Sequence, residues 1–275
     1  MSRATIVDES RDESRIAASA PNLSSSPEIA AGSPDSPEVI EALLRRSVPS
    51  PHPLKVYRGA TPDPRQATRD AVSVLRRGLL PLAEIFYSLQ GEGGRAGQAT
   101  VFVRVAGCNL ACSFCDTDFR VRREMPVEEV VAEVRSYSAD WVCLTGGEPT
   151  LYDLSALCDR LHDAGIQIQV ETNGMTPRPA WGLDHITVSP KETEGGRLHP
   201  WYLENATEFK YVVDNEADIE RALANPTAGH PGGPVLYLQP NALNPQAVSL
   251  CIDAIKAHPK RLRLSLQTHK YLQIP

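Results

Sequence analysis

Short apolar runs alternate with longer amphipathic runs from about Pro81 to the end of the chain. Seven of the short runs are rich in Val, Ile and Leu, as buried parallel strands are: residues 98–105, 141–144, 166–170, 185–188, 208–213, 235–238 and 261–266. Three longer runs repeat apolar residues at helical spacing, starting near Pro126, Leu154 and Asn244. The alternation predicts one α/β domain over residues 81–275, with mostly parallel strands joined by helices. The polar stretch between the fourth and fifth strands lacks a clear helical stripe, so we expect an incomplete barrel.

Residues 1–80 differ in composition from the rest of the chain. They are rich in Ser, Pro, Ala, Asp, Glu and Arg and have little apolar periodicity, which predicts a disordered N-terminal extension. Two stretches within it, Pro37–Arg46 and Gln66–Arg77, have roughly helical spacing. Each is shorter than a helix that is stable in isolation.

Charge and hydrophobic content exclude several classes of protein. The chain has 275 residues, a formal net charge of -6 and 41% hydrophobic residues, so it can bury one core and lacks the basic excess of a nucleic-acid-binding protein. No run approaches the ~20 apolar residues of a membrane span. The charged opening residues leave no apolar core for a signal peptide, which predicts a cytoplasmic protein with reduced thiols.

Three cysteines stand close together directly after the first predicted strand. Cys108, Cys112 and Cys115 have the spacing Cys-x3-Cys-x2-Cys, and three thiolates this close can bind three irons of a 4Fe-4S cluster, leaving the fourth iron open to another ligand. Structural zinc is the weaker alternative, because such sites normally take four ligands in two separated pairs. The remaining cysteines lie in apolar runs and are expected in the core: Cys143, Cys158 and Cys251.

Polar motifs follow six of the predicted strands. They are Gly107–Thr117, Thr145–Pro149, Glu171–Gly174, Ser189–Lys191, Gln239–Ala242 and Gln267–Lys270. Because parallel strands all end on one face of a barrel, these motifs are expected to converge there, where barrel enzymes build their sites. For any single motif, ordinary turn chemistry remains an almost equal alternative.

Together these motifs resemble those of the 7-carboxy-7-deazaguanine synthase family, within the radical S-adenosylmethionine (SAM) superfamily. The resemblance covers about Pro81–Pro275 and is carried by Glu84–Gly93 (EIFYSLQGEG), Cys108–Asp118 (CNLACSFCDTD), Thr145–Pro149, Glu171–Gly174, Ser189–Lys191 and Gln267–Pro275 (QTHKYLQIP). It implies a homodimer with a partial, distorted TIM-like barrel. It also implies a lyase that converts 6-carboxy-5,6,7,8-tetrahydropterin to 7-carboxy-7-deazaguanine with loss of ammonia, in queuosine-type biosynthesis, with a flavodoxin- or ferredoxin-type electron donor.

The resemblance makes SAM the ligand of the open iron, where its reductive cleavage yields a 5'-deoxyadenosyl radical. The implied cofactor contacts are Phe114, Cys115, Asp116, Gly147, Ser189, Pro190, Lys191, Gln239, Pro240, Asn241 and Ala242. Phe114 has packing of its own loop as an alternative role, and a lysine such as Lys191 would by default be solvated. Asn241 and Ala242 replace the Met-Asp that is usual in the family, which puts that contact in doubt.

A flat pterin with one carboxylate needs donors, acceptors and a cation in its site. The resemblance implies substrate contacts from Leu89, Gln90, Gly91, Arg104, Thr145 and Pro275. Arg104 would bind the carboxylate through two parallel hydrogen bonds, and we expect it to be catalytic together with Glu171, a polar or acid–base group. Thr117 matches the family's magnesium-linked threonine, whose hydroxyl is a hard oxygen ligand; turn capping is its alternative role.

Two other functions fit parts of the sequence. A radical SAM activating enzyme would share the cluster but abstract hydrogen from a glycine of a partner protein, and the segments Leu89–Gly93 and Gln267–Pro275 argue against it. A zinc- or cluster-stabilised interaction module would not cleave SAM. His269 lies in a family motif and is expected to be structural.

Overall fold

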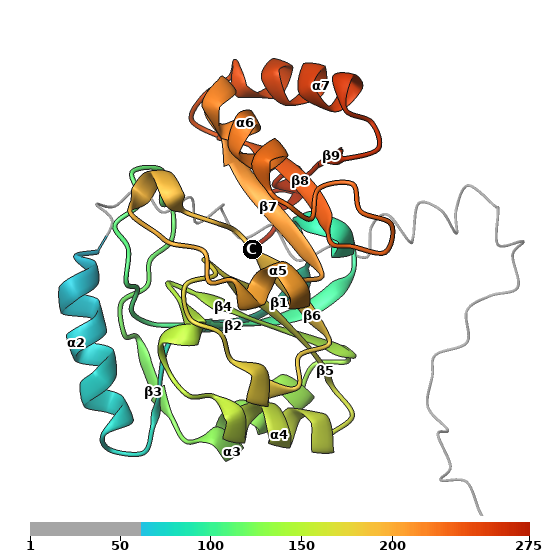
Figure 1. Cartoon of the computed structure of the whole chain (residues 1–275). Coiled ribbons are helices and arrows are strands. Elements are labelled where there is room, and N and C mark those ends of the chain that lie inside the picture. The colour runs from blue at the N-terminus through green and yellow to red at the C-terminus, as the bar shows by residue number, and fades with distance from the viewer. Residues whose placement is uncertain (1–61) are drawn as a thin grey trace, which may run out of the picture. The chain divides into compact units, whose positions relative to one another are not determined.

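A nine-stranded sheet forms the centre of the part of the chain that the structure describes, residues 62–275. In this computed structural model the strands lie in the order β3-β1-β2-β4-β5-β6-β7-β8-β9 (Figure 1). All neighbours from β2 to β9 pair in parallel, whereas β1 is antiparallel to both β2 and β3. Because β3 and β9 stand at opposite ends of this order, the sheet of residues 62–275 is an open, partial barrel.

All seven strands predicted from the sequence are present among the nine strands of the sheet. The nine strands are β1 (Leu80–Leu89), β2 (Ala99–Val105), β3 (Arg123–Met125), β4 (Trp141–Gly146), β5 (Gln167–Thr172), β6 (His185–Val188), β7 (Glu208–Val213), β8 (Val235–Pro240) and β9 (Leu262–Leu264). The sequence did not predict β1 or β3, which form the antiparallel edge of the sheet.

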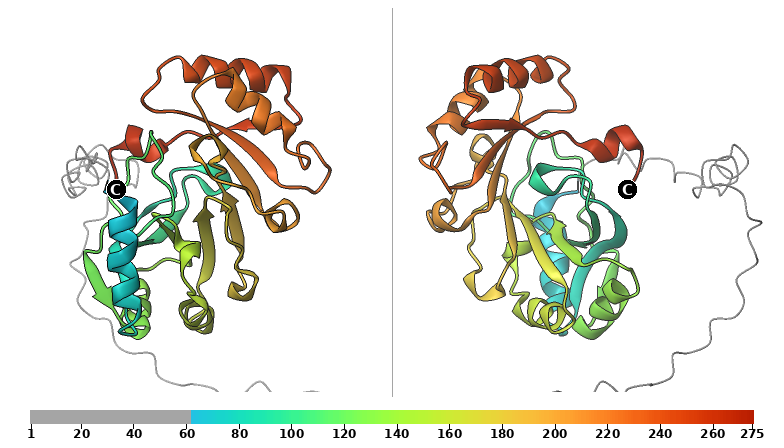
Figure 2. Two further views of the ribbon diagram at one scale, coloured as in Figure 1. Left: turned by 60° about the vertical axis from the view of Figure 1, so that its left-hand side comes forward. Right: turned by 90° about the vertical axis from the view of Figure 1, so that its right-hand side faces the viewer.

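Most of the helices connect strands and pack on the sheet. They are α2 (Pro64–Leu75), α3 (Val127–Arg135), α4 (Ser155–Asp163), α5 (Trp201–Asn205), α6 (Glu216–Ala224), α7 (Ala247–Ala257) and α8 (Thr268–Leu272), with short turns η1 (Gly93–Arg95), η2 (Pro149–Leu151), η3 (Pro179–Trp181) and η4 (Glu192–Glu194). The three predicted helices correspond to α3, α4 and α7. Figure 2 shows α6 and α7 over β7 to β9, while α8 lies apart from them. None of the helices in residues 62–275 has the length and apolar character needed to cross a membrane.

Side chains of the parallel strands alternate between an apolar outer face and a polar inner face. Leu144, Ile168, Val188 and Phe209 point outward and are fully buried in the core. The alternate positions point into the barrel and carry polar groups: Thr145, Gln169, Glu171, Thr187, Glu208 and Lys210. Burial of the outer face, at about 25 cal/mol per Å² of apolar area, stabilises the sheet. The inner face is therefore free to carry chemistry.

The predicted end of the N-terminal disordered segment, residue 80, is wrong. Helix α2, which matches the predicted stretch Gln66–Arg77, and the first residue of β1 both lie before that boundary. Ala67, Ala71 and Val74 of α2 are buried against the sheet, and this packing stabilises a helix too short to persist alone. The stretch Pro37–Arg46, like the rest of residues 1–61, lies outside the described residues.

Candidate active site

The connection from β1 to β2 folds into the barrel and forms the floor of its interior. Gln90 is 2% exposed, and its Nε2 donates to Gln169 Oε1 at 3.2 Å and to Glu171 Oε1 at 3.3 Å. Arg95 Nη1 also donates to Gln169 Oε1, at 2.6 Å, and the guanidinium carbon lies 3.5 Å from the centre of the Trp141 ring. The predicted substrate residue Gln90 is thus fixed by buried hydrogen bonds within the protein itself.

Two glycines allow this connection to approach β7. A Cβ on Gly93, whose φ is +65°, would lie 2.1 Å from Glu208 Oε1, and one on Gly94 would lie 2.8 Å from Glu208 Oε2. Instead, Gly94 N donates to Glu208 Oε2 at 2.8 Å, and Thr187 Oγ1 donates to Glu208 Oε1 at 2.9 Å. Glycine is therefore required here for direct backbone contact with a buried carboxylate.

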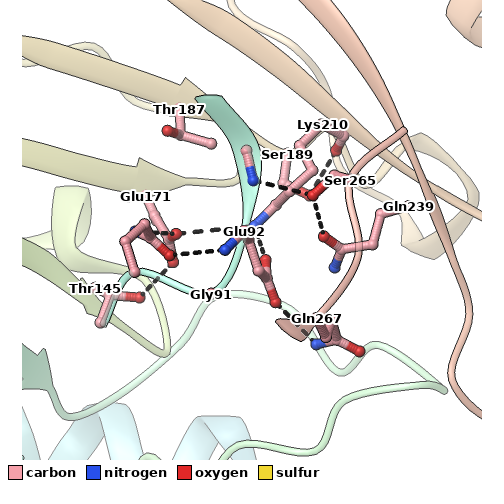
Figure 3. Close-up of polar contacts among 12 residues, drawn as sticks. Gly91, Glu92, Thr145, Glu171, Thr187, Ser189, Lys210, Gln239, Ser265 and Gln267 are labelled. Carbon is pink, nitrogen blue, oxygen red and sulfur yellow. Dashed lines mark hydrogen bonds and ion pairs between the residues drawn. The ribbon is translucent and has the colours of Figure 1, made fainter. Parts of the chain in front are cut away.

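Lys210 lies between two carboxylates beside this floor (Figure 3). Its Nζ pairs with Glu92 and lies 3.8 Å from Glu171 Oε1. Burial lowers the pKa of Lys210, but the carboxylates of Glu171 and Glu92 outweigh that effect and hold the pKa above its usual range. Burial alone would raise the pKa of Glu92, yet Lys210 lowers it to about 2. Lys210 and Glu92 are therefore both charged at neutral pH.

Glu171, near the end of β5, accepts hydrogen bonds from two of the predicted substrate residues. Its Oε2 accepts a hydrogen bond from Thr145 Oγ1 at 3.2 Å, and its Oε1 accepts the bond from Gln90 (Figure 3). A carboxylate has about four acceptor sites. Glu171 can therefore accept further hydrogen bonds from a bound molecule while these partners hold it in place.

The C-terminal segment packs against the same β1–β2 connection. Thr268, the first residue of α8, donates from its backbone N and from Oγ1 to Gly91 O, both at 2.9 Å. Gln267 Nε2 donates to Glu92 Oε1 at 2.9 Å, across 175 residues of sequence. Gly91 has no space for a side chain, because a Cβ would lie 2.3 Å from His269 Nδ1. The first and last family motifs therefore meet in space.

Leu89, Arg104 and Pro275 are the more exposed of the predicted substrate residues. Arg104 Nε donates to Glu84 Oε1 at 2.8 Å, so a bound carboxylate would have to use the Nη groups. The backbone oxygen of Pro275 accepts a hydrogen bond from Ser88 Oγ at 2.7 Å. The end of the described chain is thus anchored at β1.

The three motif cysteines lie on one loop after β2, where each is half-buried. Burial raises the pKa of Cys108 to about 12 and that of Cys112 to about 11, and it raises the pKa of Cys115 as well. Within residues 62–275, no three His, Cys, Asp or Glu side chains gather closely enough to bind one metal ion. A cubane cluster bonds each thiolate to a different iron, so its ligands stand further apart than those of a single ion. Three cysteines on one half-buried loop are the donor set that a 4Fe-4S cluster needs.

The glycine-rich end of β4 packs directly on this loop. A Cβ on Gly147 would lie 2.0 Å from Gly107 O and 2.9 Å from Cys108 Cβ. Glu148 N donates to Gly107 O at 3.0 Å, while its carboxylate, 1% exposed, accepts hydrogen bonds from two backbone N–H groups and two threonine hydroxyls. Gly147 thus permits the close approach, and Glu148 anchors it.

Phe114, Ser189 and Lys191 lie together beside the cysteine loop. Lys191 Nζ is 5.8 Å from the centre of the Phe114 ring and donates to Ser189 O at 3.0 Å. Burial, with the nearby charge of Lys210, lowers the pKa of Lys191 to about 8. A cleft of about 150 Å³ has Phe114, Pro190 and Asn241 among its lining residues. This cleft brings together residues from three motifs that the sequence assigned to SAM.

The two residues after the third cysteine have partners within the protein. Asp116 Oδ2 accepts a hydrogen bond from Lys270 Nζ of α8 at 2.6 Å, so α8 is held at the cysteine loop as well as at Gly91. Hydrogen bonds from Thr117 to the thiol of Cys115 counteract the rise in the pKa of Cys115 that burial causes. The Thr117 hydroxyl therefore lies beside a thiol that the sequence assigned to the cluster.

The last predicted cofactor motif spans the end of β8 and the turn after it. Gln239 is buried, and its Oε1 accepts a hydrogen bond from Ser265 Oγ at 3.0 Å. Asn241 Nδ2 donates to Asp214 Oδ1 at 3.3 Å, and Ala242 is exposed. Asn241 thus supports the turn in addition to lining the cleft.

Residues 102–190 match the model of the Radical SAM superfamily. A 7-carboxy-7-deazaguanine synthase from Bacteroides thetaiotaomicron is 46% identical over 191 residues, which cover 70% of this chain and 96% of that protein. The chain belongs to the 7-carboxy-7-deazaguanine synthase family. A relative of the same name from Hyperthermus butylicus is 36% identical over 227 residues, covering 72% of this chain and 94% of its own length. The crystal structure of QueE from Escherichia coli matches with a TM-score of 0.57 at 30% identity, covering 72% of this chain and 97% of that chain.

The predicted family, enzyme class and partial-barrel fold are thereby confirmed, as are the 4Fe-4S cluster and SAM. The names of these relatives give no support to the alternative of a glycyl-radical activating enzyme.

Three residues of the site were not predicted from the sequence: Lys210, Glu92 and Arg95. A signal for Lys210 was present, because Glu208 and Lys210 occupy alternate positions in the otherwise apolar run EFKYVV, and period-two spacing places both on one face of a strand. Glu92 lies in the family motif Glu84–Gly93, but no role was predicted for it. Arg95 gave no signal, because an arginine in a loop is by default solvated.

Proposed function

We propose that this protein is a radical SAM lyase that converts 6-carboxy-5,6,7,8-tetrahydropterin to 7-carboxy-7-deazaguanine with loss of ammonia. The observation that carries the proposal is the meeting of Gln267 and Thr268 with Glu92 and Gly91, next to the Glu171 carboxylate. These segments distinguish the family from other radical SAM enzymes, so their convergence at one polar centre supports a pterin site there.

Pterin binding would use the polar centre formed by Gln90, Thr145 and Glu171. The N–H groups along the edge of the pterin ring are donors, and the Glu171 carboxylate is an acceptor that Thr145 and Gln90 hold in a fixed orientation. The Nη groups of Arg104 would bind the substrate carboxylate. Glu171 would act as the acid–base group that exchanges a proton with the substrate.

Binding of the cofactors would use the cysteine loop and the residues packed on it. When bound, the cluster and SAM supply the 5'-deoxyadenosyl radical that begins the rearrangement. The three motif cysteines would bind the cluster, and Gly147, Phe114 and the Ser189–Lys191 segment would hold SAM. Thr117 would ligate Mg²⁺ through its hydroxyl.

Three further features belong to the proposal. The reductant would be a flavodoxin- or ferredoxin-type protein, because cleavage of SAM needs one electron. The enzyme would work as a homodimer, as the family resemblance implies. It would work in the cytoplasm, where thiols stay reduced.

The test is an anaerobic assay of the reconstituted protein with the carboxylated tetrahydropterin, SAM, Mg²⁺ and dithionite. We expect 7-carboxy-7-deazaguanine by mass spectrometry, together with released ammonia, and neither product from a Cys112→Ala control. A protein that binds its cluster and cleaves SAM but forms no deazaguanine would show that the substrate is wrong.

A further inference from the structure

Helix α2 contacts the backbone of the first cysteine of the cluster loop. Thr68 Oγ1 donates to Cys108 O at 2.9 Å and accepts from Cys108 N at 3.1 Å. One hydroxyl therefore satisfies both backbone polar groups of a half-buried residue, which would otherwise lose their hydrogen bonds on burial. The family motifs begin only at Glu84, downstream of this helix.

The position of Thr68 is set by the way α2 begins and packs. The Asp63 side chain accepts from Arg65 N at 3.0 Å and caps the helix, and Pro64 occupies its first turn. Ala67 and Ala71, one turn apart, are fully buried against the sheet. Because their side chains are small, the helix lies close to the sheet, and the first half of α2 reaches the loops that follow β2 (Figure 1).

The other sides of the same corner are also closed. A Cβ on Gly107, whose φ is +85°, would lie 2.2 Å from Tyr152 Oη and 3.2 Å from Thr68 Cα. Tyr152 Oη donates to Ala106 O at 3.0 Å. Gly147 packs against Gly107 and Cys108 from a third direction. The backbone from Ala106 to Cys108 is therefore enclosed by its neighbours and has little room to move.

We propose that Thr68 is a positioning residue for the iron–sulfur cluster, so that α2 is part of the catalytic unit although it lies outside the family motifs. By holding both backbone groups of Cys108, Thr68 fixes where the first thiolate points before iron arrives. The proposal rests on the proposed function only in taking Cys108 as a cluster ligand. It does not depend on the identity of the substrate.

The test compares Thr68→Val, which removes the hydroxyl at nearly constant volume, with Thr68→Ser, which keeps it. Ser73→Ala is the matched control, because Ser73 carries a hydroxyl on the same helix and is exposed. The full-length variants are reconstituted anaerobically, and the loss of the cluster to an iron chelator is followed by absorbance. We expect Thr68→Val to lose its cluster roughly tenfold faster than the unaltered protein, the factor that corresponds to ~1.4 kcal/mol, because the freed backbone groups are half-buried. Thr68→Ser and Ser73→Ala should keep the rate of the unaltered protein.

A second measurement uses the unaltered protein, so it does not depend on whether a variant folds. In the cluster-free protein, amide hydrogen exchange at Cys108 should be slower than at Cys112, because the Cys108 N–H is bonded to Thr68 of α2. Equal exchange at these two amides, or a Thr68→Val protein with unchanged cluster retention, would overturn the proposal. Neither readout involves the pterin, so a failure of the proposed substrate would leave this test intact.

Discussion

Replacing Lys210 with Met should destabilise the protein strongly near neutral pH. The side chains of Lys210 and Glu92 are 7% and 13% exposed, so water screens their interaction little. Burial would raise the pKa of Glu92, but Lys210 lowers it from 4.5 to about 2, and a drop of this size corresponds to about 3 kcal/mol of folding free energy. Removing one partner of a buried pair typically costs ~3–5 kcal/mol. We therefore expect Lys210→Met to lose about 3 kcal/mol near pH 7.

The loss should shrink as the pH is lowered. In the unaltered protein, the stability that the Glu92 carboxylate contributes is present above pH 4.5 and disappears as the pH falls toward 2. In Lys210→Met the buried Glu92 lacks its cation, so its pKa rises and it takes up a proton at a higher pH. A protonated carboxyl costs less to bury than an unpaired charge. The two proteins should therefore approach each other in stability as the pH falls from 4.5 toward 2.

Urea unfolding followed by tryptophan fluorescence measures this difference, under anaerobic conditions with and without the cluster. Trp181 is fully buried and should report the transition. Lys210→Arg, which keeps the charge, and Lys260→Met, which removes an exposed lysine, serve as controls and should lose less than about 1 kcal/mol. A Lys210→Met protein within about 1 kcal/mol of the unaltered one near pH 7 would refute the reasoning.

Four further outcomes are expected. Cys112→Ala should abolish 5'-deoxyadenosine formation under dithionite, measured by chromatography, whereas Cys251→Ala should retain it; full cleavage by Cys112→Ala would exclude the cysteine as a ligand. Arg104→Lys should raise the KM for the pterin at least ~10-fold more than that for SAM, since lysine offers no planar fork of donors; equal effects would assign Arg104 to structure. Deleting residues 1–61 should leave turnover and iron content unchanged, because their composition resembles that of non-folding segments; a folded, iron-loaded but inactive truncation would contradict this. Removing Leu272–Pro275 should raise the pterin KM with iron content unchanged, and unaltered kinetics would show that this end is only surface.

The parallel part of the fold was predictable because its strands are short apolar runs, which the local sequence is enough to identify. These apolar side chains are buried on the outer face of the sheet. Strand β1 escaped because Pro81 interrupts it, and a proline inside a run argues against a paired strand. Here Pro81 lies near the start of β1, at its pairing with the three-residue β3. Helix α6 was not predicted, although Asn215 and Asp218 form a capping box that can be identified from the sequence.

The cysteine loop was predictable because its three thiols are contiguous in sequence, but the partners that complete the site were not. In the sequence, Lys210 is a single charge in an apolar strand, which is costly to bury without a partner. Its partner, Glu92, is 118 residues away along the chain. Thr68 reads as an ordinary helical threonine, and its partner Cys108 is 40 residues away. Such pairings follow from the tertiary fold, which spacing in a single sequence does not encode.

The contact that positions the first cysteine reaches less far along the chain than the contacts that build the pterin pocket, and this bears on the order in which they can form. Thr68 and Cys108 are 40 residues apart, whereas Asp116, further along the cysteine loop, pairs with Lys270 across 154 residues. The contacts of the pterin side, from Gln90 to Gln169, Glu92 to Lys210 and Glu92 to Gln267, span 79, 118 and 175 residues. Longer loops cost more entropy to close, and long-range contacts slow folding. In a newly made chain, the backbone of Cys108 can therefore take its place before the pocket for the pterin has formed.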